Sequence, residues 1–223
     1  QIGYRRAVGP THEGIPGKFV PIDTRFEGQT WLPGYDAMGE GIFLTADGDG
    51  WHPSLQGDSA KKWQGGFEEA RQLRDPASIY PGNYGHNALH PVFVWWHTLS
   101  HLLVRALSVE SGYSLASIRE RIYLEVNEET GQACGGILLY TSGYGSDGTL
   151  GGLIALVPRF EHILASAISM GETCSADPLC REHRFAPGKH SGAACYACSL
   201  ISETSCEHRN LWLDRNVLLD NLP

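Results

Sequence analysis

Five of the six cysteines in this 223-residue chain lie within its last fifty residues. They form a Cys-x5-Cys pair, then a CxxC pair, and finally a single cysteine. Zinc takes four thiolate or imidazole ligands at about 2.0–2.3 Å, and paired cysteines are its usual source of ligands. The spacing therefore predicts a Zn²⁺ site whose favoured ligands are Cys174, Cys180, Cys195 and Cys198.

Two further side chains offer substitutes within this ligand set. Cys206 and His208 follow the CxxC pair closely, and either would reach the ion if one of the four cysteines does not bind it. Four protein ligands leave no open coordination position, so we expect a structural zinc ion that does not activate water. The rival interpretations are buried free cysteines or, in a secreted chain, three disulfides.

Composition favours a globular protein that does not coat nucleic acid. The chain is 42% hydrophobic, contains six tryptophans and carries a net charge of −8, with no strongly basic segment. The apolar run from Val92 to Trp96 is too short to cross a bilayer. The start at Gln1, without the features of a signal peptide, favours an excised piece over a secretory precursor. We expect a cytoplasmic location, where clustered cysteines bind metal more often than they form disulfides.

The first of two predicted domains covers residues 1–90, which are rich in glycine and proline. Short apolar stretches such as residues 41–45 predict short strands and loops without long helices. Residues 47–51 begin like a calcium-binding loop, but Trp51 occupies a ligand position and His52 replaces the required glycine. We interpret that segment as a turn.

The second predicted domain covers residues 91–223. Apolar residues at helical spacing predict a long helix over residues 92–108. The other expected elements are strands over 122–126 and 136–142 with a turn at 128–131, a helix from about 153 or 159 to 170, and a closing helix over 210–219. We expect an α+β fold in which a small mixed sheet packs against helices and zinc staples the C-terminal loop region.

A pair of histidines on the long helix suggests a different metal site. His97 and His101 are four residues apart and share one face of the helix. A metalloprotease would have glutamate after the first histidine, where this chain has Thr98, and the sequence indicates no third ligand. Hydrogen-bonded histidines packed inside the protein, or a partner surface, are the competing interpretations.

A glycine-rich loop follows the second strand. Residues 143–148 match G-x-G-x-x-G between a predicted strand and a predicted helix. No acidic residue ends a following strand, so a tight turn is favoured over a dinucleotide site, although the amides of the next helix could hold a phosphate. The alternative function is a small metal- or nucleotide-dependent hydrolase that uses His97, His101 and the Gly143–Gly152 loop.

Four segments together resemble one known family. They are His97-Thr-Leu-Ser-His101-Leu-Leu, Ser114-Leu-Ala-Ser-Ile-Arg-Glu-Arg121, Tyr140 through Gly152, and Gly192-Ala-Ala-Cys-Tyr-Ala-Cys198 with its continuation to Arg215. They resemble the helicase-associated zinc-binding domain named for the MrfA repair helicase, in the version found in the DISARM anti-phage system. The resemblance spans about residues 90–220.

This resemblance implies a cofactor and a partner. It implies a four-cysteine zinc site, which falls on Cys174, Cys180, Cys195 and Cys198. It also implies work beside a superfamily 2 helicase, which in DISARM is DrmA, and the pair engages DNA. Because this chain lacks helicase motor motifs, we expect a non-enzymatic accessory subunit or domain that engages DNA through the complex.

Overall fold

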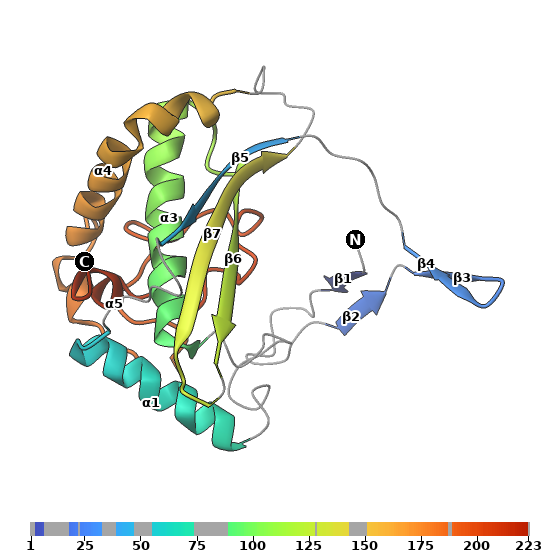
Figure 1. Ribbon diagram of the computed structural model, residues 1–223, viewed down its shortest axis with the longest axis horizontal. Coiled ribbons are helices and arrows are strands. Elements are labelled where there is room, and N and C mark those ends of the chain that lie inside the picture. The colour runs from blue at the N-terminus through green and yellow to red at the C-terminus, as the bar shows by residue number, and fades with distance from the viewer. Residues whose placement is uncertain are drawn as a thin grey trace.

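A long central helix and a three-stranded sheet form the centre of the molecule (Figure 1). The structure is a computed structural model that describes residues 3–6, 18–21, 23–32, 39–46, 55–73, 89–127, 129–142, 151–186 and 189–222. The α+β class predicted from the sequence is confirmed. Two small antiparallel hairpins precede the centre: β1 (Gly3–Arg6) with β2 (Lys18–Pro21), and β3 (Thr24–Phe26) with β4 (Gln29–Trp31).

The central sheet has the order β5-β7-β6 and is antiparallel throughout, where a mixed sheet was expected. Its strands are β5 (Gly39–Thr45), β6 (Ile118–Val126) and β7 (Ala133–Ser142). Both predicted strands of the second segment are therefore confirmed, and each begins earlier than expected. Asn127 closes the hairpin between β6 and β7, because its Oδ1 accepts from the amides of Glu129 and Thr130 at 2.9 and 3.0 Å.

The central helix α3 (Pro91–Ser111) confirms the predicted long helix. Pro91 fits the first turn, His90 Nδ1 accepts from the Val92 amide, and Gly112 ends the helix in the left-handed conformation at φ 78°. Nearly every side of the helix is buried, against the sheet on one face and α4 and α5 on the other. Length and hydropathy alone would allow it to span a membrane, but 83% of its apolar window is buried inside the structure, as in a core helix.

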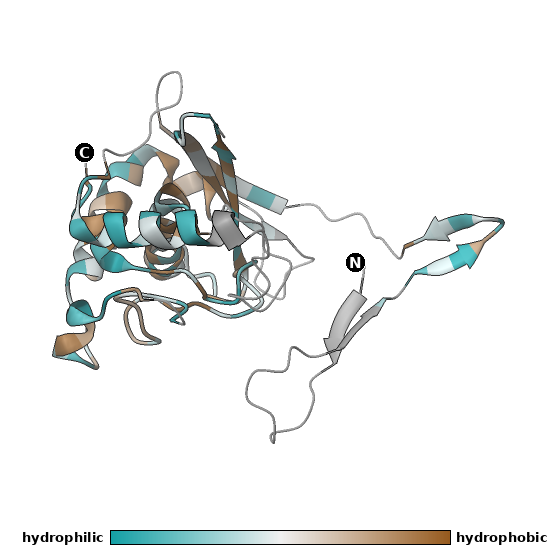
Figure 2. Ribbon diagram, turned by 90° about the horizontal axis from the view of Figure 1, so that it is seen from below, coloured by the Kyte–Doolittle hydropathy of each residue, from teal (hydrophilic) through white to brown (hydrophobic). Residues whose placement is uncertain are grey.

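The expectation that residues 1–90 contain no long helix is wrong, because α1 (Asp58–Leu73) is a 16-residue helix. Its buried face carries Trp63 and Phe67, and its outward face is mainly hydrophilic (Figure 2). The Trp63 ring stacks on Phe185 with centroids 3.8 Å apart. A Cβ at Gly66 would approach that phenylalanine ring to 2.7 Å. Gly66 lowers the helix propensity of this segment, but a larger residue there would collide with the ring of Phe185.

The C-terminal third supplies short helices and irregular loops. They are η2 (Ile154–Arg159), α4 (Phe160–Glu172), η3 (Pro178–Glu182) and α5 (Arg215–Leu219). The helix predicted to end near residue 170 is confirmed, but the closing helix is shorter than expected. Asn210 and Trp212 have φ of 59° and 60°, which breaks any helix there, and Asp214 caps the start of α5.

Two predicted features lie outside the described residues. They are the turn at residues 47–51 and residues 143–150 of the glycine-rich loop.

Candidate metal centre

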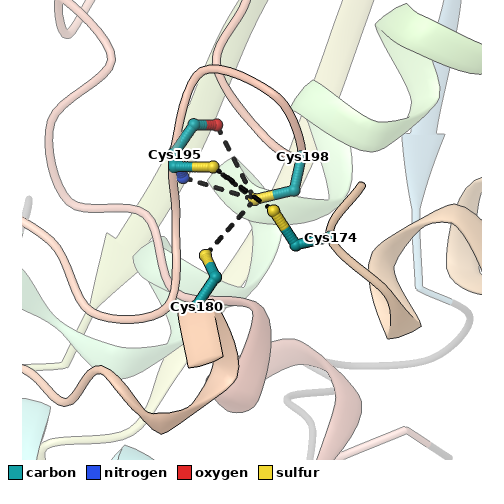
Figure 3. A group of neighbouring side chains, drawn as sticks. All are labelled: Cys174, Cys180, Cys195 and Cys198. Atoms are coloured by element: carbon teal, nitrogen blue, oxygen red, sulfur yellow. Dashed lines mark hydrogen bonds between the residues drawn. The ribbon is translucent and has the colours of Figure 1, made fainter. Parts of the chain in front are cut away.

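Four cysteine side chains converge between α4, η3 and the turn over residues 195–198 (Figure 3). Their sulfur atoms all lie within 4.8 Å of one another. The Sγ distances are 3.5 Å for Cys174–Cys195, 3.6 Å for Cys195–Cys198 and 3.8 Å for Cys180–Cys198. The structure thus brings together the four cysteines favoured from the sequence.

These distances fit a tetrahedral zinc ion. Four sulfur atoms at about 2.3 Å from a central ion lie about 3.8 Å from one another. A disulfide would need its sulfur atoms at about 2.05 Å, and all six cysteines are free thiols. The four side chains would hold zinc as thiolates in a closed site, where the ion stabilises the fold and has no position for a substrate.

Backbone amides donate toward two of the four sulfur atoms, those of Cys198 and Cys174, whereas burial raises the pKa of Cys195. Cys198 Sγ accepts from the Cys195 amide at 3.3 Å. Burial raises the pKa of Cys174, but hydrogen bonds from the backbone of Ala176 and Asp177 and from neighbouring thiols lower it to about 7. The Cys174 thiol can therefore lose its proton near neutral pH, as a zinc ligand must.

A buried cation, Arg215, stands beside the cluster. Burial raises the pKa of Cys180 to about 12, and the Arg215 guanidinium opposes this rise through a hydrogen bond and its charge. Arg215 is held in place by the carbonyls of Gly171 and Ala193, at 2.7 and 3.2 Å. Four thiolates around Zn²⁺ carry a net charge of −2, so a fixed cation offsets charge that the fold has removed from water.

We expect Arg215→Gln to weaken zinc binding by about 10–100-fold, because side chains that support metal ligands typically contribute that much. Competition with a chromophoric chelator measures the affinity. Arg209→Gln is the matched control, because Arg209 is an exposed arginine outside the cluster. Equal zinc affinity in the two variants would contradict the role assigned to the buried guanidinium.

The proposed substitutes for a cysteine ligand lie elsewhere. Cys206 gathers with His97, His101 and Glu120 in a second cluster, whose potential ligand atoms also lie within 4.8 Å of one another. His208 belongs to neither cluster, although its ring packs 5.3 Å from that of His97. The sequence did not reveal that the two helix histidines meet an acidic and a sulfur-containing side chain.

The second cluster is sealed inside the protein. His97 and His101 are completely buried, so no substrate reaches them in this structure. Burial lowers the pKa of His97, although Glu120 opposes this effect. Burial also raises the pKa of Glu120, but the neighbouring His101 and His97 hold it well below its usual value. The lowered pKa of Glu120 thus depends on the two histidines that face it.

One signal in the sequence could have identified Glu120. Ile118, Glu120 and Ile122 alternate along β6, so the glutamate occupies a position that faces the core. A carboxylate is rarely buried without a partner that neutralises it. The acidic residue in this inward row was therefore a candidate for a partner of the nearby histidines.

The amides expected to hold a phosphate already have a partner. After the glycine-rich loop, the amides of Leu153 and Ile154 donate to the Glu40 carboxylate at 3.0 and 3.2 Å. Tyr113 donates its hydroxyl proton to the same carboxylate at 2.8 Å. An internal carboxylate thus occupies the place that a phosphate would need.

Comparison with known proteins agrees with this geometry. Residues 99–199 match the model of the MrfA Zn-binding domain, a segment that includes all four clustered cysteines and ends before Cys206. Over 99% of its length the chain is 32% identical to the DISARM protein DrmB of Bacillus paralicheniformis, of which it spans 38%. The chain is therefore similar to the MrfA Zn-binding domain over residues 99–199, and it is similar to DrmB over 38% of the length of that protein.

Proposed function

We propose that this chain is a non-catalytic, zinc-stapled accessory subunit or domain that partners a superfamily 2 DNA helicase in anti-phage defence. The similarity to DrmB along almost the whole chain is the observation that carries this proposal. The partner is a DrmA-like helicase subunit, the complex engages DNA, and the site of action is the cytoplasm. Zinc at Cys174, Cys180, Cys195 and Cys198 has a structural role in this complex.

The chemistry of the cysteine cluster supports a structural role. Four sulfur atoms at tetrahedral spacing fill the coordination sphere of zinc, so the ion cannot bind and activate a water molecule. The hydrolase alternative relied on His97, His101 and the glycine-rich loop. Both histidines are buried, and the amides of Leu153 and Ile154 bind Glu40, so neither these histidines nor these two amides are free to hold a substrate.

The electrostatics favour DNA binding by the complex over tight binding by this chain. With a net charge of −8, the chain repels the phosphate backbone overall. Any DNA affinity of the isolated chain should therefore be weak and should disappear between about 50 and 200 mM salt. A helicase partner would supply the cationic surface and the motor.

Co-expression with a DrmA-like superfamily 2 helicase tests the proposal. We expect the two proteins to co-purify in a fixed ratio, and we expect the complex to shift a DNA duplex in a salt titration that leaves the isolated chain unbound. Nanomolar DNA binding by the isolated chain at physiological salt would instead make it the primary DNA reader. Absence of a complex with the helicase would overturn the proposed partnership.

A further inference from the structure

We infer that His97, His101, Glu120 and Cys206 form a second metal site, separate from the four-cysteine cluster. The residues come from three parts of the chain that only folding brings together: α3, β6 and the loop after the CxxC turn. Each of the four side chains is buried, and each offers one ligand atom to a common point. Two imidazole nitrogens, one carboxylate oxygen and one sulfur are a ligand set suited to zinc.

The distances suit a single central ion. Glu120 Oε1 lies 2.9 Å from His97 Nε2 and 3.2 Å from His101 Nε2. His97 Nε2 lies 3.3 Å from Cys206 Sγ. Nitrogen and oxygen ligands at about 2.0–2.1 Å from a tetrahedral zinc ion are about 3.3 Å apart. These three distances are close to the spacing of zinc ligands, and all four atoms lie within 4.8 Å of one another.

The orientation of the His101 ring suits a metal ligand. His101 Nδ1 lies 2.8 Å from the carbonyl of Ser199, which only accepts, so this nitrogen carries the proton. In a neutral imidazole the other nitrogen then presents its lone pair to the Glu120 carboxylate. Nε2 and the carboxylate oxygen thus face one another, and a cation between them would bind both. This arrangement, Nδ1 on a carbonyl and Nε2 inward, is the usual one for a metal-bound histidine.

Cys206 is also arranged as a ligand. Its sulfur accepts from the amides of His208 and Asn210, each at 3.3 Å. Burial and the neighbouring Glu120 raise the pKa of this thiol, and the two amides oppose that rise. Cys198 in the first cluster receives the Cys195 amide in the same way.

Charge balance supports a divalent ion. As zinc ligands, Cys206 as a thiolate and Glu120 as a carboxylate would bring two negative charges into a site that is closed to water, and two neutral imidazoles would bring none. A divalent cation makes the group neutral. Because four protein ligands complete the coordination sphere, the ion would be structural. It would have no open position for water, so this site gives no support to the hydrolase interpretation.

The second site would fix the CxxC turn to the core. The carbonyl of Ser199 binds His101, and Arg105 on the same helix donates to the carbonyls of Ala197 and Leu200 at 2.8 and 3.2 Å. Residues 199–205 connect the two clusters. The two ions would therefore hold both ends of this connection, one against α3 and β6 and the other against α4 and η3.

Metal counting on the purified chain tests this inference. Elemental mass spectrometry should find two zinc ions per wild-type chain grown with zinc, and one in Cys206→Ser and in Glu120→Gln. Glu120→Gln keeps the size of the side chain but removes its charge and one acceptor oxygen, so the zinc count is taken on chain whose circular dichroism shows that it is folded. Cys134→Ser is the control, because Cys134 belongs to neither cluster and its variant should keep both ions.

X-ray absorption at the zinc edge gives an answer even if the variants do not fold. Two occupied sites provide five sulfur and three nitrogen or oxygen ligands, whereas the cysteine cluster alone provides four sulfurs and nothing else. One zinc per wild-type chain with a pure sulfur shell would overturn the inference. Two ions retained in a folded Cys206→Ser or Glu120→Gln chain would overturn it as well.

Discussion

Cys198→Ser is expected to release zinc from the four-cysteine cluster and to unfold the region from Cys174 through α5. Structural zinc contributes on the order of 10 kcal/mol to the folding of small domains. Whole domains are stable by only about 5–15 kcal/mol, so loss of the ion removes most of the margin. The cysteine loops have little regular structure with which to compensate. Zinc content, near-ultraviolet circular dichroism and limited proteolysis of the variant measure the effect.

Cys134→Ser is the matched control for this experiment, because it removes a thiol of β7 that lies outside both clusters. We expect the control to keep its zinc and its resistance to protease. A Cys198→Ser chain that retains the full zinc content and a protected C-terminal region would show that the cluster does not hold the structural ion.

Local patterns in the sequence were sufficient to predict those elements whose start, end and apolar pattern all lie within one segment. The helix over Pro91–Ser111 combines an apolar run with a proline start and a glycine stop, and these signals are contained in the segment itself. The cysteine cluster was equally visible, because the CxxC spacing reflects the geometry of the ligand turn. In both cases the physical cause and the sequence signal lie within the same stretch of chain.

Elements that depend on distant contacts were not predictable in this way. The glycines of α1 lower helix propensity, and the reason for Gly66 is the ring of Phe185, more than 100 residues away. Asparagine tolerates positive φ, so Asn210 offered a weak local signal, whereas the positive φ of Trp212 had none. Tertiary packing overrides local propensity at Gly66 and Trp212.

The second cluster was missed for a related reason. The helical spacing of His97 and His101 was evident, but two histidines alone do not identify a metal site. The other two potential ligands had to be known as well. Glu120 reaches the histidines from a strand, and Cys206 reaches them from a loop. Cys206 also lies close to the CxxC pair in sequence, which suggested it as a substitute ligand in the four-cysteine cluster. The structure instead groups it with the two histidines and Glu120. Proximity along the chain was a poor guide to proximity in space.

Glu40→Gln is expected to destabilise the protein by about 3 kcal/mol at neutral pH, because hydrogen bonds to a charged acceptor are worth about 1.5–3 kcal/mol. The ionised carboxylate accepts from the amides of Leu153 and Ile154 and from the Tyr113 hydroxyl. The glutamine amide group would instead turn a donor toward one of these donors. Denaturant unfolding of both proteins measures the difference.

The loss should depend on pH in a defined direction. Burial raises the pKa of Glu40, but hydrogen bonds from Leu153, Tyr113 and Ile154 bring it below its ordinary value of 4.5. A lowered pKa means that this contribution to stability is complete above pH 4.5 and declines as the pH falls through the lower, folded-state value. Glu125→Gln makes the same change at an exposed position of β6 and should cost little at any pH. If the two substitutions had equal effects from pH 3 to 8, Glu40 could not be the anion that secures the start of η2, and those amides would be available to another acceptor.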